Sequence, residues 1–122
     1  MQIRKSLGCA ILLALGLVRL DTASATIVYN ATIVGVTEDI AYPNFAFIKL
    51  SVAPTGLACG TATTFHYTLP LLDPTTHQAI NQQLYALLLS AYMSGKTVSI
   101  VGTGACTEDP TVESLRGLNV IG

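Results

Sequence analysis

The sequence predicts one small domain that is mainly β and contains a single helix. Three observations support this class. The chain has 122 residues, 51% of them hydrophobic and 11% charged, which suffices for one core and is too short for two domains. Segments rich in β-branched residues, broken by Pro, Gly and Asn, dominate residues 26–69. Apolar residues at helical spacing follow between residues 80 and 91.

The first 25 residues have the pattern of a secretory signal peptide. Arg4 and Lys5 precede an apolar run over residues 7–18, and small residues follow at 23–25. The run is shorter than the roughly 20 apolar residues of a membrane anchor, and Arg19 follows it directly. We therefore expect cleavage after Ala25, a domain over residues 26–122, a secreted or periplasmic location and no membrane span.

The domain that remains after this cleavage is mildly acidic. Three basic residues stand against six acidic ones in residues 26–122. Binding to nucleic acid requires a basic surface that neutralises phosphates. The sequence therefore predicts no nucleic-acid partner.

Cys59 and Cys106 are the two cysteines of the exported chain, because Cys9 lies in the predicted signal peptide. Thiols in an oxidising compartment are typically paired, so we expect one disulfide. Closing a loop of this length stabilises a fold by about 4 kcal/mol on the chain-entropy account. A metal or redox pair is the alternative, but the sequence has no C-x-x-C motif and no histidine beside either cysteine.

Three strands are expected before the helix. Residues 26–36 are β-branched or small and predict a long, bent strand. Residues 37–44 contain turn-forming residues and predict a loop, and residues 63–69 predict the third strand. The second strand, residues 45–52, alternates and is expected to bury one face fully and the other in part. The residues expected to face the core from this strand are Ala46, Ile48, Leu50 and Val52.

One strong helix is expected to begin at Pro74, with Asp73 as its cap, and to end at Gly95. The chain then returns to strands at residues 97–101 and 115–121, with a turn rich in Gly, Thr and Asp between them. The predicted buried stripe of the helix is Ile80, Leu84, Leu87, Leu88 and Ala91.

This order of elements matches the five-stranded OB-fold barrel, in which a helix between the third and fourth strands closes one end. A ferredoxin-like fold would need a second helix, and the first half of the domain is too rich in β-branched residues and turn breakers to form one. The disulfide would join the start of the third strand to the turn after the fourth.

The helix also carries apolar residues away from this stripe. At about 100° per residue, Tyr85, Leu89 and Met93 are expected near the opposite face, where a solvent-exposed helix should be polar. A helix that is apolar on two faces lies between two surfaces. One is the barrel, and we expect the other to belong to a second copy of the chain, so that these residues form a homo-oligomer interface. The alternative is that they are scattered apolar residues on an ordinary surface.

Residues 47–50, Cys59 and residues 84–98, whose sharpest element is the S-G-K-x-V junction at residues 94–98, resemble the B subunits of subtilase cytotoxin and of pertussis-like toxins. They are also similar to a group of small secreted proteins of Gram-negative bacteria. The likeness covers roughly residues 33–102. It implies an OB fold, assembly into pentamers, binding of sialylated host glycans and a toxin A subunit as a partner.

The residue types that enzymes use are scarce. Residues 26–122 contain two histidines, His66 and His77, and no G-x-S-x-G motif. Their acidic pairs at 38–39 and 108–109 are adjacent in sequence and expected on loops, unlike the carboxylates of a glycosidase, which face each other across a cleft. We therefore expect no catalytic residue, no metal site and no cofactor, and we assign His77 no function.

Recognition by OB folds uses the face of strands 2 and 3 and the loops after strands 1 and 4. In the first of these loops, Tyr42 offers an aromatic platform for carbohydrate, and Glu38, Asp39 and Asn44 offer planar polar groups. His66, on the polar face of the third strand, is expected at the surface, with ligand contact as the alternative. If a glycan binds this acidic loop, we expect a neutral glycan, or contacts through hydroxyls and backbone amides. The alternative is an ordinary connecting loop without a ligand.

Two functions therefore remain. The first is a secreted, oligomeric, carbohydrate-binding module of the toxin B-subunit type. The alternative is a small secreted or periplasmic OB-fold domain with a structural or interaction role and no toxin partner.

Overall fold

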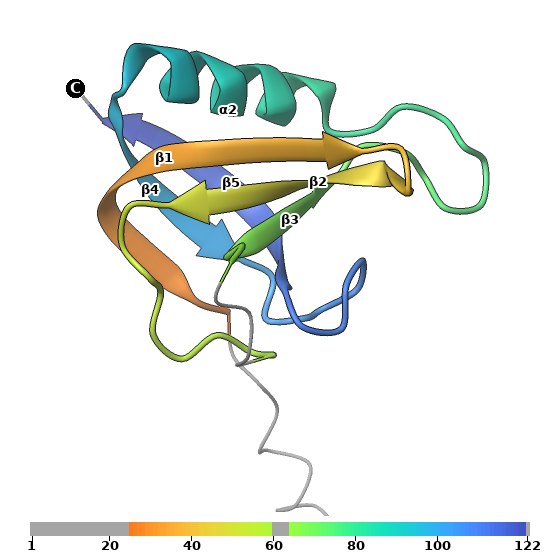
Figure 1. Ribbon diagram of the computed structural model, residues 1–122, viewed down its shortest axis with the longest axis horizontal. Coiled ribbons are helices and arrows are strands. Elements are labelled where there is room, and N and C mark those ends of the chain that lie inside the picture. The colour runs from red at the N-terminus through yellow and green to blue at the C-terminus, as the bar shows by residue number, and fades with distance from the viewer. Residues whose placement is uncertain (1–24, 60–63, 122) are drawn as a thin grey trace, which may run out of the picture.

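The computed structural model describes residues 25–59 and 64–121. In this part of the chain it has five strands and one helix (Figure 1), which confirms the predicted mainly β class. The predicted signal peptide lies outside the described residues except for Ala25. The elements are β1 (Ile27–Asp39), β2 (Tyr42–Leu50), β3 (Tyr67–Pro70), α2 (Gln82–Ser94), β4 (Thr97–Gly102) and β5 (Glu113–Ile121).

The five strands close into a barrel in the order β1-β2-β3-β5-β4. The long strand β1 makes closure possible, because its first half pairs with β4 and its second half with β2. Figure 1 shows it bending between the two. A register shift lies between Val28 and Ala31, where Asn30 has a left-handed φ of 55°, a conformation that asparagine tolerates. The predicted long, bent first strand is confirmed.

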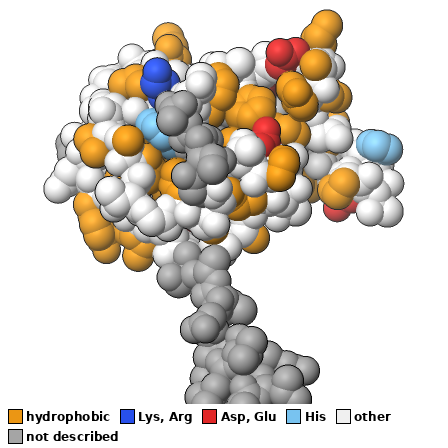
Figure 2. All heavy atoms as spheres, turned by 60° about the horizontal axis from the view of Figure 1, so that its bottom comes forward, with side chains coloured by type: hydrophobic (Ala, Val, Ile, Leu, Met, Phe, Trp, Pro, Cys, Tyr) orange, Lys and Arg blue, Asp and Glu red, His pale blue; other side chains and the backbone are white. Residues whose placement is uncertain are grey.

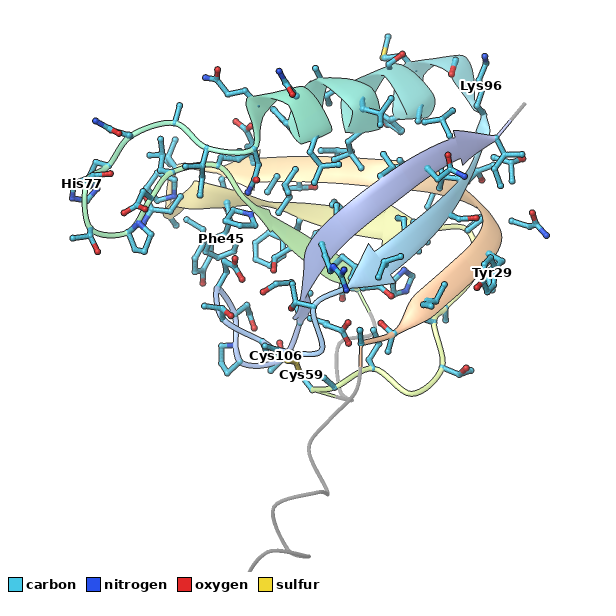
Figure 3. All side chains as sticks on the ribbon, turned by 180° about the vertical axis from the view of Figure 1, so that it is seen from behind. Tyr29, Phe45, Cys59, His77, Lys96 and Cys106 are labelled. Atoms are coloured by element: carbon cyan, nitrogen blue, oxygen red, sulfur yellow. A yellow bond between two sulfur atoms is a disulfide. The ribbon has the colours of Figure 1, made fainter. Side chains whose placement is uncertain are left out.

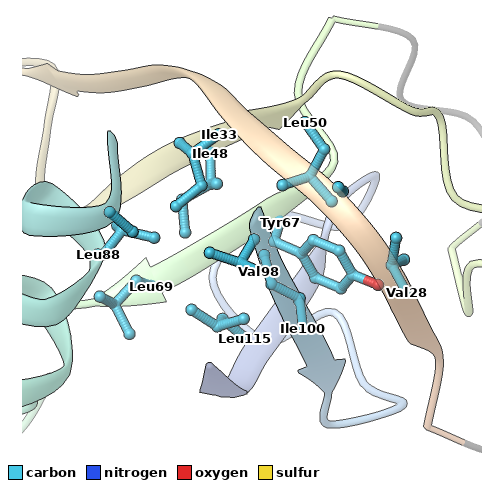
Figure 4. Packing of buried hydrophobic residues seen from close by; sticks show 12 residues of the cluster. Val28, Ile33, Ile48, Leu50, Tyr67, Leu69, Leu88, Val98, Ile100 and Leu115 are labelled. Carbon is cyan, nitrogen blue, oxygen red and sulfur yellow. The ribbon is translucent and has the colours of Figure 1, made fainter. Parts of the chain in front are cut away.

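The core fills the inside of this barrel (Figure 4), and Tyr67 lies at its centre. The alternation predicted for the second strand is confirmed, because Ala46, Ile48 and Leu50 are buried inside. Val52 lies beyond the end of β2 and is exposed, so its predicted burial is wrong. The buried residues of the main core are Val28, Ala31, Ile33, Ile48, Leu50, Tyr67, Leu69, Leu88, Ala91, Val98, Ile100 and Leu115.

The start of the helix differs from the prediction. The Asp73 carboxylate accepts the backbone N–H groups of Thr75 and Thr76, at 2.8 and 3.0 Å, and so stabilises a turn in place of a helix. His77 and Asn81 have left-handed φ values of 58° and 57°, which a continuous right-handed helix cannot contain. The helix α2 therefore begins at Gln82.

The predicted helix end is confirmed. Gly95 follows α2 with a left-handed φ of 66°, which glycine adopts without steric cost. Its N–H donates to the Tyr92 carbonyl, and the next N–H, from Lys96, donates to the Ala91 carbonyl. These bonds close the last turn of the helix.

The helix packs across one end of the barrel against β1 and β5 (Figure 1), and its phase corrects two expectations. Leu88 and Ala91 are buried, as predicted, whereas Leu87 is 40% exposed. Tyr85 was expected on the outer face, but it packs against the core. The geometric reason is that Tyr85 follows Leu84 by about 100° and so borders the buried face.

The first connection and the starts of two strands also differ from the predictions. The predicted loop over residues 37–44 is a tight hairpin, in which Ile40 and Ala41 form the turn and the Asp39 carboxylate accepts the Ala41 N–H at 2.9 Å. The third strand begins later than predicted, at Tyr67. The fifth strand begins two residues earlier, at Glu113, because its first residues pair with β3 in parallel.

The predicted disulfide is confirmed. Cys59 precedes β3, and Cys106 lies in the loop between β4 and β5; their Cα atoms are 6.2 Å apart. Figure 3 shows the bridge at the end of the barrel opposite to the helix. Across the described stretches of the chain, no helix is both long and apolar enough to span a membrane.

Candidate functional site

The outer face of β2 carries a cluster of aromatic side chains. Because Phe45 and Phe47 alternate with the inward residues of β2, they point away from the barrel interior. Their ring centroids are 5.2 Å apart, and Phe65 stacks on Phe47 at 4.8 Å. Tyr42 packs against both at 5.8 Å. The three phenylalanine rings and Val112 form a second, smaller core outside the barrel.

Val112 reaches this cluster because the β4–β5 loop, residues 103–112, folds back toward β2 and β3. The disulfide fixes the loop at Cys106. The carboxylate of Glu108 accepts the Ser114 hydroxyl and, at 3.4 Å, the Thr68 hydroxyl of β3. The loop is therefore held in one position beside the aromatic cluster.

A hollow of about 380 Å³ lies where this loop meets β2 and β3. Its walls are mainly apolar, and Asn44 and Glu108 add an amide and a carboxylate. Such a surface can pack against the apolar face of a sugar while the polar groups bind its hydroxyls. The lining residues are Asn44, Phe45, Pro70, Leu72, Pro74, Ile80, Thr107 and Glu108.

The residues predicted from the sequence to bind a ligand do not lie in one place. Asn44 lines this hollow. Glu38, Asp39 and Tyr42 line a second, smaller hollow of about 290 Å³ at the tip of the β1–β2 hairpin, and half of the Tyr42 surface is exposed. Phe45 and Glu108 were missed, because the contact between β2 and the β4–β5 loop leaves no periodic signal in the sequence.

The expectation of a surface position for His66 is wrong. His66 is 5% exposed, and its Nδ1 accepts the Leu50 N–H at 2.9 Å. Its own N–H donates to the Ile48 carbonyl at 2.8 Å, so the residue binds the end of β2 on two sides. Burial, and then the charge of Lys49, lower the pKa of the imidazole. His66 is therefore a neutral acceptor at pH 7, and it does not line either hollow.

The three residues predicted to form an oligomer interface occupy different positions. Tyr85 and Leu89 line an apolar groove of about 500 Å³ between α2 and the preceding segment, whereas Met93 is 82% exposed. Burial first, then the hydrogen bond to Glu38 and its charge, raise the pKa of Tyr85 to about 12. The Tyr85 hydroxyl therefore lies near Glu38 of the β1–β2 hairpin.

Glu113 is one of the six acidic residues in residues 26–122, and the sequence predicted no special role for it, but its side chain is fully buried at the start of β5. Its Oε1 accepts the Ala58 N–H at 3.0 Å, and its Oε2 accepts the Gly104 N–H at 3.3 Å. A usable signal was its spacing of two residues from the inward Leu115, which puts both on one face of a strand.

In the described part of the chain, no three His, Cys, Asp or Glu side chains gather in a way that could hold a metal ion. The surface drawn in Figure 2 is largely uncharged, with hydrophobic side chains spread among neutral polar ones. No protein-family model and no curated protein matches the chain.

Proposed function

We propose that the chain is a secreted, non-enzymatic OB-fold module that binds a neutral glycan and assembles with copies of itself. The strand order of the barrel supports the OB assignment, as do the long β1 shared by two neighbours and the parallel pair β3–β5. The helix between β3 and β4, packed on one end of the barrel, is the element that an OB fold carries at this place.

The observation that carries the proposed function is the position of the larger hollow. It is lined by residues of β2, of β3, of the β4–β5 loop and of the segment between β3 and α2. OB folds bind oligosaccharides on the face of strands 2 and 3 beside the β4–β5 loop. Asn44 and Glu108 there are hydrogen-bonding groups beside apolar walls, the combination that sugar binding requires.

The charge of these surfaces favours a neutral ligand. Glu108 lies in the larger hollow, and Glu38 and Asp39 lie in the smaller one. A sialic acid carboxylate placed beside these groups would meet like charge, which lowers affinity and slows association. The proposal therefore differs from the toxin B subunits that the chain resembles, whose glycans are sialylated.

Purified exported protein should be tested on a glycan array, with affinities then measured by calorimetry. We expect neutral saccharides to bind more tightly than their sialylated counterparts. Asn44→Ala should weaken binding about tenfold, the effect of losing about 1.4 kcal/mol, because the Asn44 side chain lines the hollow. Asn119→Ala, an exposed asparagine on β5, is the matched control and should bind like wild type. Absence of binding to every glycan, or equal affinity of the two variants, would contradict the proposal.

Self-assembly is tested separately. Leu89 and Met93 lie on the groove side and the outer side of α2, and the exposed Met93 can be changed without disturbing the core. We expect wild type to sediment as an oligomer, and Met93→Glu and Leu89→Glu to sediment as single chains with unchanged circular dichroism. A wild-type monomer at tens of micromolar would contradict assembly.

One observation favours the alternative of a small secreted structural domain without a toxin partner. The exposed surface of α2 is mixed, because the polar Gln83, Ser90 and Ser94 are exposed along with Leu87, Tyr92 and Met93. A helix held between two subunits is expected to be more uniformly apolar. A wild-type monomer that binds no glycan would support this alternative. A secreted enzymatic subunit that co-purifies with the chain would support the toxin B-subunit type.

A further inference from the structure

The buried carboxylate of Glu113 has no role in the proposed glycan site. Four hydrogen bonds reach it, from the backbone N–H groups of Thr26, Ala58 and Gly104 and from the Thr26 hydroxyl. None of these donors is a cation. A fully buried carboxylate normally pairs with a positive group, because partial charges on N–H groups replace its lost hydration only in part.

Thr26 supplies two of these four bonds and is held firmly. Its hydroxyl donates to Oε2 of Glu113 at 2.8 Å, and its backbone N lies 3.3 Å from the same oxygen. Because its single hydroxyl proton is directed to Glu113, the Tyr67 hydroxyl at 2.7 Å donates to it in turn. The Thr26 carbonyl accepts the Gly102 N–H at 2.9 Å. Thr26 is 8% exposed, while Ala25 before it is exposed.

Gly102 makes room for this arrangement. A Cβ atom at residue 102 would lie 1.7 Å from Oε2 of Glu113 and 2.9 Å from the Tyr67 ring. The carboxylate thus lies directly against the backbone of β4, in a space that the Cβ atom of any other residue type at position 102 would occupy.

The peptide bond between Ala25 and Thr26 is the bond that the signal-peptide pattern predicts to be cleaved. Hydrolysis by a signal peptidase adds one water molecule and breaks this bond, leaving a carboxylate on Ala25 and an ammonium group on Thr26. The ammonium nitrogen is the same atom that now lies 3.3 Å from Oε2.

We infer that Glu113 is the binding site for the amino terminus that cleavage after Ala25 creates. Processing gives the buried carboxylate a positive partner that the precursor lacks at this position. The ion pair joins the start of β1 to the start of β5, and the disulfide lies beside it through Ala58 and Gly104. This inference does not depend on glycan binding.

The ion pair should change how the amino terminus titrates. A free α-amino group has a pKa of about 7.7–8.0, and a buried carboxylate beside it favours the charged form and raises that value. Besides Glu113, Tyr67 is the titratable side chain that contacts Thr26, and burial raises the pKa of its hydroxyl. Tyr67 therefore stays neutral while the amino group titrates.

The test begins with the full chain exported from a bacterial cell. N-terminal sequencing and intact mass should show that it starts at Thr26, and a different start would overturn the inference. The matched control starts at Ala25 and is released from a fusion protein. Both forms retain every described strand, the helix and the disulfide.

Two measurements compare these forms. The α-amino group of the form that starts at Thr26 should titrate at a higher pH than that of the control, and at pH 7.5 it should react with acetic anhydride about tenfold more slowly. It should also unfold at a higher urea concentration. In Glu113→Gln both differences should disappear. Should that variant fail to fold, the comparison of the two unsubstituted forms decides. Equal labelling rates or equal unfolding midpoints in those forms would overturn the inference.

Discussion

The two ends of the barrel are closed by different chemistry. At one end α2 covers the opening with apolar side chains, of which Leu88 and Ala91 are fully buried. At the other end Thr26, Tyr67 and Glu113 form a hydrogen-bonded network beside the disulfide. Figure 4 shows the Tyr67 hydroxyl directed away from Leu88 and toward this second end. One end is thus held by buried area and the other by polar and covalent links.

This difference determines what each end responds to. Burial of apolar area depends little on pH or on chain processing. The network around Glu113 depends on charge, and it gathers segments that are distant in sequence, since its donors come from residues 26, 58 and 104. We therefore expect the helix end to respond mainly to changes in side-chain volume. The polar end should respond to redox state, pH and processing.

The largest effect is expected from breaking the disulfide at the polar end. The Cys59–Cys106 bridge closes a loop with a sequence separation of 47 residues. Replacing both cysteines by alanine should lower the free energy of unfolding by about 4 kcal/mol, because the unfolded chain regains the entropy that the bridge removes. Urea unfolding with and without reductant measures this, and reductant should have no effect on the variant. Two reactive thiols in unreduced exported protein would contradict the bridge.

The next effect tests the apolar end. Leu88→Ala should lower the free energy of unfolding by about 3 kcal/mol, because it leaves a cavity under the helix. Leu87→Ala is the matched control from the same helix, and because Leu87 is 40% exposed it should cost about 1 kcal/mol. Both values are measured by urea unfolding. Equal losses in the two variants would contradict the rotation of α2 that buries Leu88 and exposes Leu87.

The sequence correctly predicted the features that depend on a local pattern, on a single residue or on the disulfide. Alternation over Ala46, Ile48 and Leu50 correctly indicated the inner face of β2. Gly95 correctly marked the helix end, because its left-handed conformation depends on the residue itself. The helix start was wrong because Asp73 can cap a turn as well as a helix. The segment that follows it is shaped by tertiary contacts such as the Leu72–Ala79 bridge.

The candidate site was less predictable because distant segments build it. Asn44 was proposed from its loop, and it does line the larger hollow. Glu108 lies beside this hollow only because Ser114, Thr68 and the disulfide hold the β4–β5 loop. Glu113 had a signal in its spacing from Leu115, but the predicted strand began two residues too late to use it.

The smallest expected effect concerns pH at the polar end, through His66. Its Nδ1 accepts the Leu50 N–H, a bond that requires the unprotonated ring. Burial and Lys49 lower the pKa of His66 in the folded protein below the value of about 6.5 in an unfolded chain. Below about pH 6.5 the unfolded chain therefore binds a proton more readily than the folded protein. The stability from this bond is fully present above that pH and declines as the pH falls toward the folded pKa.

Urea unfolding at pH 7.5 and pH 5.5 separates this effect from other titrations. Wild type should lose more stability between the two pH values than His66→Gln, whose side-chain oxygen can still accept the Leu50 N–H and does not titrate. His77→Gln is the matched control, since His77 is exposed in the turn before α2, and it should follow wild type. If His66→Gln declines as steeply as wild type, the imidazole does not make the polar end sensitive to acid, and the contrast between the two ends reduces to Glu113 and the disulfide.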